Sequence, residues 1–559
     1  MKSFLPAIAS VALLAALPGA AAAEIDPARI TAHVKVLSSD AFEGREPATA
    51  GETKAVDYII GQFKAVGLKP GGDLKGGRRA WTQDVPLARF EIRGPVTVQV
   101  KAGGDTLTYA QGEQIAVRAA ATGADHVSIR DAPVVFAGYG VKAPERDWDD
   151  FKGMDLKGKV VLVLVNDPDF ETGPDTKDGG DFGGKAMTYY GRWTYKYEEA
   201  ARQGAAGFVV IHESAPAAYG WATVKNSNIN AIFDIIRADP TKAHAPLEAW
   251  IQRDAAVDLF RRAGLDFEAL TKAARTRAFR PAALTGVTMS VDYAVDARKI
   301  VSRNVIGVAP GARRPDEHVI YTAHWDHLGV GLPDARGDRI YNGAVDNADG
   351  IATLIELGRA FASARPTDRS VVFLAVTAEE KGLLGSEYYA ANPVYPLATT
   401  VADINMDALS PAGPAKDFGS AGNAGVTLQD DLVAAGEARG RYYTPDPRPE
   451  AGSFYRSDHF PFAKRGVPAI SFGSGLDLVD GGRARGQALQ KAYLADRYHQ
   501  PADEFGPDWN SDGVAADGDL LFDLGRTLAN STRWPTWKPG SEFKAQRDRT
   551  AQARKQGTD

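Results

Sequence analysis

The chain has 559 residues, of which 44% are hydrophobic and 24% are charged, and this composition is typical of a globular protein with more than one domain. The formal net charge of −6 leaves no large basic field, which argues against nucleic acids and anionic membrane surfaces as partners. The chain contains no cysteine, which excludes disulfide bonds and a thiol nucleophile.

Residues 1–23, MKSFLPAIASVALLAALPGAAAA, have the pattern of a secretory signal peptide. Lys2 is followed by an apolar core at 4–17, and the alanines at 21–23 fit the A-x-A pattern before a cleavage site. The apolar run is too short to cross a bilayer, and prolines interrupt it. We therefore predict an exported protein, periplasmic or extracellular, with no membrane anchor.

Residues 24–95 begin with two helical patterns. The segments IDPARITAHVKVLSSDAF and GETKAVDYIIGQFKAVGL carry apolar residues at three- and four-residue spacing. In the second segment Val56, Ile59, Ile60 and Phe63 share one face, and Gly67 is a stop signal.

Residues 96–292 change to short β-like runs, among them VTVQVKAGGDTLTYA, APVVFAGYGV and GKVVLVLVND. An acidic, glycine-rich stretch at 167–184 is typical of a surface loop, and a helix followed by a buried strand is predicted at 195–214. This region is predicted to be a β-rich module inserted into the chain.

Residues 293–540 alternate strands and helices. The predicted strands are HVIYTAHW, SVVFLAVTA, TVADINMD and PAISFG, and the segment 347–364 is a predicted helix. Continuous apolar strands alternating with helices predict an α/β fold with a mixed, mostly parallel sheet and helices on both faces. The polar residues 541–559 are predicted to be a mobile tail, or at most a surface helix.

Histidines and carboxylates follow the apolar strands. A single histidine or carboxylate at a strand end is typical of a helix cap or a turn, but here several successive strands end in such residues. The carboxyl ends of parallel strands meet at one edge of the sheet, so we expect these side chains to lie together. Two imidazoles and three carboxylates suit a pair of divalent ions, zinc first. No HExxH or GxSxG motif is present. The residues are His324, Asp326, His327, Asp346, Glu379, Glu380, Asp407, His499 and Asp503.

These residues lie in motifs that occur in the order AHWDHLG, NGAVDNADG, TAEEKGLLGS, NMD, SDHFPFAKRGVPA and YHQPADE. In this the chain resembles the bacterial di-zinc aminopeptidases, which are related to glutamate carboxypeptidase and the transferrin receptor. The segment SSDAFEGREPATAGE near the start resembles the opening of that family. The segments GYGVKAPERDWDDFKGMDLKGKVVLVL and EEAARQGAAGFVV resemble its inserted protease-associated domain. The resemblance implies a peptidase domain in two parts, 24–95 and 293–540, around an insert at 96–292.

The resemblance also implies a role for each site residue. His324 and Asp407 would bind one Zn²⁺ ion, Glu380 and His499 would bind the second, and Asp346 would bridge the two. Glu379 would be the general base and acid.

Further roles follow for their neighbours. Asp326 would orient His324, and Asp503, by its position, would orient His499. Tyr498 or Tyr455 would donate to the oxyanion, although either is also compatible with a core aromatic. The Asp346–Asn347 bond is expected to be cis. His327 is expected to be structural or a cavity wall, and Asp458 and His459 to lie behind a ligand or contact substrate.

Several functions are compatible with this site. The first is an exported zinc aminopeptidase that removes N-terminal residues from peptides. The alternative is a glutamate-carboxypeptidase-like enzyme that releases C-terminal acidic residues, for which Arg456, Arg483 and Arg485 are available. A non-enzymatic binding protein would have lost metal ligands, and all five are present; a zinc-dependent cyclase is disfavoured because that branch lacks the insert. In the insert, Trp193, Tyr195 and Tyr197 would line the entrance or simply pack.

Overall fold

The computed structural model describes residues 24–170, 182, 184–422, 425–539, 541 and 543–556. The predicted signal peptide at 1–23 and most of the predicted acidic loop lie outside these residues. Within this part of the chain, the search for a helix long and apolar enough to cross a membrane finds none.

A mixed sheet forms the core of the C-terminal half. Its central strands are parallel, in the order β22 (Ala469–Ser474), β19 (Thr400–Met406), β15 (Arg314–His324) and β18 (Arg369–Val376). Strand β14 (Ala282–Ala309) pairs antiparallel with β18, and β20 (Asp417–Ser420) pairs antiparallel with β22 and parallel with β21 (Tyr442–Tyr443).

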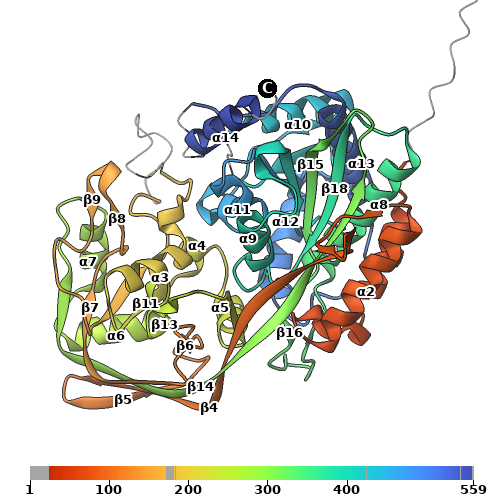
Figure 1. Ribbon diagram of the computed structural model, residues 1–559. Helices are drawn as coiled ribbons and strands as arrows, with labels where there is room; N and C mark the ends of the chain where they lie inside the picture. Colours follow the sequence, from red (N-terminus) through yellow and green to blue (C-terminus); the bar gives the residue numbers. More distant parts are fainter. Residues whose placement is uncertain are drawn as a thin grey trace, which may run out of the picture.

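Helices cover both faces of this sheet, which confirms the predicted fold class. On one side α2 (Ala50–Ala65), α8 (Asp349–Ser363) and α13 (Asp512–Asn530) pack against it; on the other lie α9 (Leu384–Ala391) and α11 (His459–Lys464) (Figure 1). The predicted apolar face of α2 is buried, since Val56, Ile59 and Phe63 have no exposed surface. The remaining helices here are α1 (Pro27–Leu37), α10 (Thr427–Ala438) and α12 (Gly482–Asp496).

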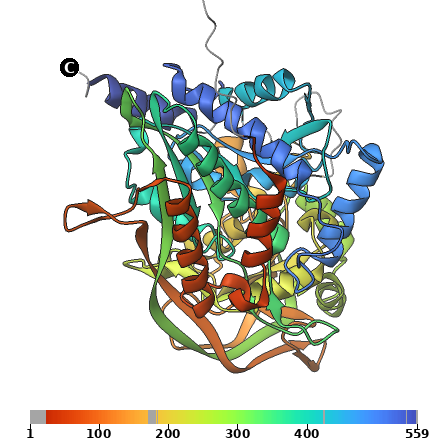
Figure 2. The ribbon, with the colours of Figure 1, turned by 90° about the vertical axis from the view of Figure 1, so that its right-hand side faces the viewer.

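Two long strands join this half to the insert. Strand β4 (Thr82–Ala102) pairs antiparallel with β14 from Thr82↔Val305 to Lys101↔Thr288. Figure 2 shows the two strands side by side as one curved ribbon. The boundaries expected at 95/96 and 292/293 therefore fall inside continuous strands, because pairing, not a linker, connects the two parts.

The insert continues the sheet with parallel strands of its own, β7 (His126–Phe136), β10 (Val160–Leu164), β11 (Gly207–His212) and β13 (Leu247–Gln252), and ends at β6 (Ile115–Val117). It carries helices as well as the predicted strands: α3 (Trp193–Arg202), α4 (Ser214–Ala217), α5 (Trp221–Asn228), α6 (Arg253–Arg262) and α7 (Phe267–Ala274). Shorter strands are β1 (Lys69–Pro70), β2 (Leu74–Lys75), β3 (Arg78–Arg79), β5 (Asp105–Tyr109), β8 (Lys142–Ala143), β9 (Trp148–Asp149), β12 (Ile232–Ile235), β16 (Gly329–Val330) and β17 (Ile340–Tyr341).

Of the two possibilities predicted for the tail, a mobile segment or at most a surface helix, the structure has a helix over Lys544–Gln556, named α14. Arg547 on this helix is 2% exposed, and its guanidinium donates to the carbonyl oxygens of Thr400 and Val401 at 3.1 Å each. The polar composition gave no sign of this attachment, because one buried cation that satisfies main-chain carbonyls at the start of β19 holds the helix on the fold.

We therefore expect the substitution Arg547→Ala to lower the free energy of unfolding by about 2–3 kcal/mol, because it removes charge-assisted hydrogen bonds to buried carbonyls. Urea denaturation measures the change. Arg549→Ala, on the exposed side of the same helix, is the matched control and should change stability by less than about 0.5 kcal/mol. Equal effects of the two substitutions would show that α14 is not anchored through Arg547.

Candidate metal centre

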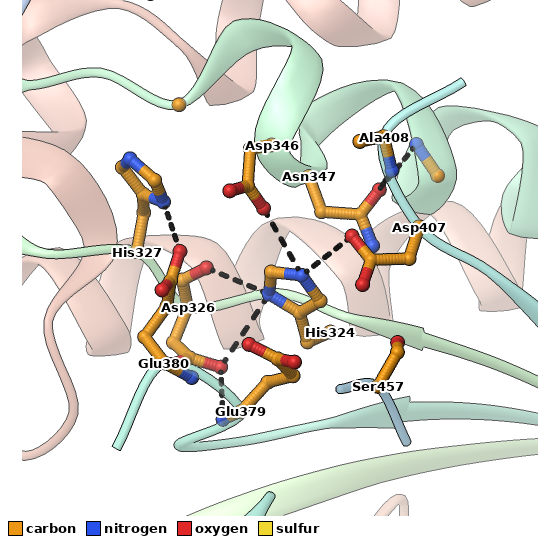
Figure 3. Close-up of polar contacts among 12 residues, drawn as sticks. His324, Asp326, His327, Asp346, Asn347, Glu379, Glu380, Asp407, Ala408 and Ser457 are labelled. Carbon is orange, nitrogen blue, oxygen red and sulfur yellow. Dashed lines mark hydrogen bonds and ion pairs between the residues drawn. The ribbon is translucent and has the colours of Figure 1, made fainter. Parts of the chain in front are cut away.

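Three parallel strands bring the predicted ligands to one edge of the sheet. His324 is the last residue of β15, Glu379 and Glu380 follow β18 closely, and Asp407 comes directly after β19. Because the strands are parallel, their carboxyl ends lie together, and the side chains converge (Figure 3).

The carboxylate of Asp346 lies between two imidazoles. Its Oδ1 atom is 3.2 Å from Nε2 of His324, and its Oδ2 atom is 3.3 Å from Nε2 of His499. Asp346 belongs to η5 (Ala344–Ala348), the π-helical turn before α8, and the Asp346–Asn347 bond is cis, as predicted. A carboxylate that offers one oxygen to each side has the arrangement of a bridging ligand.

Each imidazole has a second carboxylate beside the same nitrogen. Nε2 of His324 is 3.2 Å from Oδ1 of Asp407, and Nε2 of His499 is 3.0 Å from Oε2 of Glu380. The five side chains therefore form two groups of one histidine and one carboxylate that share Asp346. Each group has the donor set that zinc prefers.

The backbone separates the two adjacent glutamates. Ala378 has a left-handed conformation, with φ of 52°, and so ends the alternation of the strand before Glu379. The N–H groups of Glu379 and Glu380 donate to the two carboxylate oxygens of Asp326 at 3.1 and 3.4 Å. Glu380 can then face His499 while Glu379 faces His324.

Asp326 holds His324 through its main chain. Nδ1 of His324 donates to the carbonyl oxygen of Asp326 at 3.1 Å, whereas the nearest carboxylate oxygen is 3.9 Å away. The residue expected to orient His324 is in place, but its carboxylate holds the glutamate backbone instead. This division could not be inferred from the sequence, which does not distinguish the two kinds of oxygen.

The expected contact between Asp503 and His499 is absent from the described part of the chain. Asp503 instead accepts hydrogen bonds from the N–H groups of Val345 and Asp346, the latter at 3.0 Å. It thus fixes the turn that carries the bridging carboxylate. Its closeness to His499 in sequence was misleading, because the chain turns at His499, whose φ is 56°.

The insert supplies the partners of His499. Oγ of Ser227 lies 2.8 Å from Nδ1 of His499, and Nδ2 of Asn226 donates to its carbonyl oxygen at 3.0 Å. Both residues are on α5, and no sequence signal pointed to them. The insert is therefore part of the site's supporting structure.

A buried arginine from the N-terminal segment supports two loops of the site. Arg45 donates to the carbonyl oxygen of Trp325 at 2.8 Å and to those of Asn342 and Gly343 at 2.6 and 2.9 Å. It is 1% exposed, and burial lowers its pKa to about 10, so it remains a cation at neutral pH. The motif EGREP was part of the family resemblance, but the role of Arg45 was not predicted.

The electrostatics of the cluster favour a bound cation. Burial raises the pKa of Asp326 to about 6. Burial also holds the pKa of Glu379 well above its usual range, and the nearby carboxylates of Asp407 and Glu380 raise it further. Burial opposes protonation of His324, yet Glu379 and Asp407 raise its pKa well above the ordinary value. Excess buried negative charge of this kind is what divalent ions neutralise.

In each of three overlapping groups of residues, one ligand atom from every member lies within 4.8 Å of the others, close enough to share a metal ion. The groups are His324, Asp346 and Asp407; His324, Glu379 and Glu380; and His327, Asp346 and Glu380.

His327 is closer to the metal ligands than predicted. It has no exposed surface, and its Nδ1 atom is 2.5 Å from Oε1 of Glu380, so it is more than a cavity wall.

Asp458 accepts from Ser386 at 2.6 Å, and His459 packs edge-on against Phe454. These contacts place Asp458 and His459 behind the site.

A cavity of about 1430 Å³ lies between the insert and the C-terminal half and contains the candidate metal cluster, because Asp346, Glu379, Glu380, Asp407 and His499 line it. Trp193 lines it, whereas Tyr195 and Tyr197 are buried. Of the arginines considered for carboxylate recognition, Arg456 lines the cavity, and Arg483 is paired with Asp417 at 2.8 Å. Arg485 is paired with Asp480.

Comparisons with known proteins agree with this architecture. Residues 304–521 match the model of peptidase family M28. A probable zinc metalloprotease of Pyricularia oryzae is 29% identical over 154 residues, which is 28% of this chain and 27% of the relative. Aminopeptidase NAALADL1 of Mus musculus is 35% identical over 128 residues, 22% of this chain and 15% of the relative. The chain thus spans little more than a quarter of these relatives at most.

The fold comparison covers more of the chain. An aminopeptidase from Aneurinibacillus sp. strain AM-1 superposes with a TM-score of 0.51 and 19% identity, over 93% of this chain and 97% of that one.

We expect Ser227→Ala to weaken zinc binding about 10-fold or more, because His499 loses the hydrogen bond that orients its ring. A competition titration with a chromophoric chelator measures the affinity of the weaker site. Ser363→Ala, at the exposed end of α8, is the control and should bind zinc like the unaltered protein. Unchanged affinity in the Ser227 variant would show that α5 does not support the site.

Proposed function

Because the chain carries a peptidase family M28 domain over residues 304–521, we propose that it is an exported zinc aminopeptidase that hydrolyses N-terminal residues from peptides. The observation that carries the proposal is the bridging position of Asp346 between Nε2 of His324 and Nε2 of His499. With Asp407 and Glu380, this arrangement fits two Zn²⁺ ions per chain.

The chemistry of the proposal assigns separate tasks to the adjacent glutamates. Zinc bound by these residues would lower the pKa of the hydrolytic water and polarise the scissile carbonyl. Glu380 holds metal, so its carboxylate is not available for proton transfer. Glu379 accepts the proton of the attacking water and later delivers it to the leaving amine.

Tyr498 is the proposed donor to the oxyanion. Burial raises the pKa of its hydroxyl, which therefore stays protonated. Its oxygen accepts a hydrogen bond from Nη2 of Arg456 at 3.3 Å, and its own proton remains available for a developing negative charge. Tyr455 instead packs against Phe454 and Phe460, which makes it the weaker candidate.

The names of the similar proteins support aminopeptidase activity. The mouse relative and the superposed bacterial structure are both called aminopeptidases, and the fungal relative is called a probable zinc metalloprotease. The cavity is large enough for a peptide and closed on one side by the insert, as suits an exopeptidase.

We expect Glu379→Gln to keep both zinc ions but lower kcat by about 100- to 10,000-fold, because the proton acceptor is lost while the ligands remain. Glu380→Gln is the matched variant, and it should instead lose about one zinc ion per chain. Elemental analysis and the hydrolysis of leucine p-nitroanilide measure the two effects. If the Glu379 variant hydrolyses the substrate at a near-normal rate, the assignment of the base is wrong.

Export is the part of the proposal that depends on the signal-peptide pattern alone. We expect the mature protein to begin at Glu24 and to appear in the periplasm or the medium. N-terminal sequencing of the protein from each cell fraction tests this. A cytoplasmic protein that retains Met1 or Lys2 would contradict it.

A further inference from the structure

Two guanidinium groups stand beside the metal cluster in the same cavity. Arg456 donates from Nη2 to the hydroxyl oxygen of Tyr498 at 3.3 Å, and its guanidinium carbon lies 5.2 Å from the ring centre of Tyr219. The ring of Tyr498 stacks on His499, with centroids 3.9 Å apart. Arg456 therefore contacts the same tyrosine that stacks on a proposed metal ligand.

Arg192 approaches from the insert. It is 9% exposed, lines the cavity, and has a buried Nε atom with no hydrogen-bond partner in the described part of the chain. Burial, and then the neighbouring charge of Arg456, lower its pKa to about 10, so both groups are cations at neutral pH. The two positive charges repel each other, and the loss of their hydration on burial destabilises the folded protein further.

Several other arginines of the cavity are neutralised by carboxylates. Arg118 is 3.6 Å from Glu248, and Arg237 is 2.6 Å from Asp234. Within the described residues, Arg192 and Arg456 form no such ion pair. The insert and the C-terminal half thus each present an arginine without a carboxylate partner to the cavity that holds the candidate metal ligands.

We propose that Arg192 and Arg456 bind the free C-terminal carboxylate of a short peptide, so that the preferred substrates are dipeptides and tripeptides. This inference rests on the proposed function. A carboxylate between the two groups would remove their repulsion and form charge-assisted hydrogen bonds with the planar guanidinium groups. The peptide itself supplies that anion.

The spacing limits the length of the peptide. A peptide residue spans at most about 3.6 Å, so a dipeptide carries its terminal carboxylate one residue beyond the scissile carbonyl. Arg456 lies 3.3 Å from the hydroxyl of Tyr498, and the ring of Tyr498 lies 3.9 Å from that of His499, so the arginine is within a few residue lengths of the candidate ligands. On a dipeptide, removal of the N-terminal and of the C-terminal residue is the same cleavage.

A carboxylate could also come from an acidic side chain after the scissile bond, and substrates can separate the two sources. The zinc-loaded full-length protein is assayed with Leu-Gly, Leu-Gly-amide, Leu-Glu-amide and leucine p-nitroanilide. We expect kcat/KM for Leu-Gly to exceed that for Leu-Gly-amide by about 10- to 100-fold. Leu-Glu-amide should resemble Leu-Gly-amide.

The variants test the two arginines directly. Arg456→Gln should abolish the preference, so that the ratio of kcat/KM for Leu-Gly to kcat/KM for Leu-Gly-amide falls to about one, mainly through KM for Leu-Gly. Arg456→Lys should recover part of the loss, and Arg192→Gln should behave like Arg456→Gln. Arg298→Gln, an exposed position on β14, is the charge-matched control and should keep the full preference.

Equal hydrolysis of Leu-Gly and Leu-Gly-amide by the unaltered enzyme would overturn the inference and leave the proposed function standing. Preference for Leu-Glu-amide over Leu-Gly would overturn it in favour of an acidic side chain. No hydrolysis of any of the four substrates would overturn the proposed function, and this inference with it. The unaltered enzyme alone decides these outcomes, whether or not the variants fold.

Discussion

The position of one carboxylate, that of Asp346 between two imidazoles, is the constraint on which the site depends. It is set by the backbone, because Asp503 accepts from the N–H groups of Val345 and Asp346. Gly343, with φ of 58°, opens the turn, and a Cβ there would lie 2.2 Å from the carbonyl oxygen of Asp346. A side chain at this position would displace the bridging group, so the turn requires glycine.

Three separate stretches of chain hold the site around this carboxylate. The N-terminal segment contributes Arg45, which donates hydrogen bonds to main-chain carbonyl oxygens of two loops. The insert contributes Ser227 and Asn226 on α5, and the C-terminal half contributes the ligands themselves. The insert therefore does more than narrow the cavity, since displacement of α5 would also release the ring of His499. Pairing between β4 and β14 along their length, with one register shift between Asp292 and Ala294, is what keeps the insert in this position.

The fold class and the set of metal-binding candidates were accessible from the sequence, and the supporting contacts were not. His324, Glu380 and Asp407 stand at strand ends in recognisable motifs, and a parallel sheet brings such ends together. Ser227 lies 272 residues from its partner His499, with no periodic pattern to mark it. Asp503 was assigned to the nearer histidine, but the backbone reversal there points it at Asp346. The attachment of the helix at Lys544–Gln556 was not predicted, because a single buried arginine, not an apolar face, makes it.

The central claim is that one carboxylate bridges two metal ions, and anomalous diffraction from crystals of the zinc-loaded protein tests it most directly. Data on either side of the zinc absorption edge should show two peaks roughly 3.5–4 Å apart, one on each side of the Asp346 carboxylate. One peak should lie beside His324 and Asp407, and the other beside His499 and Glu380. A single peak, or two peaks that do not share Asp346, would contradict the account.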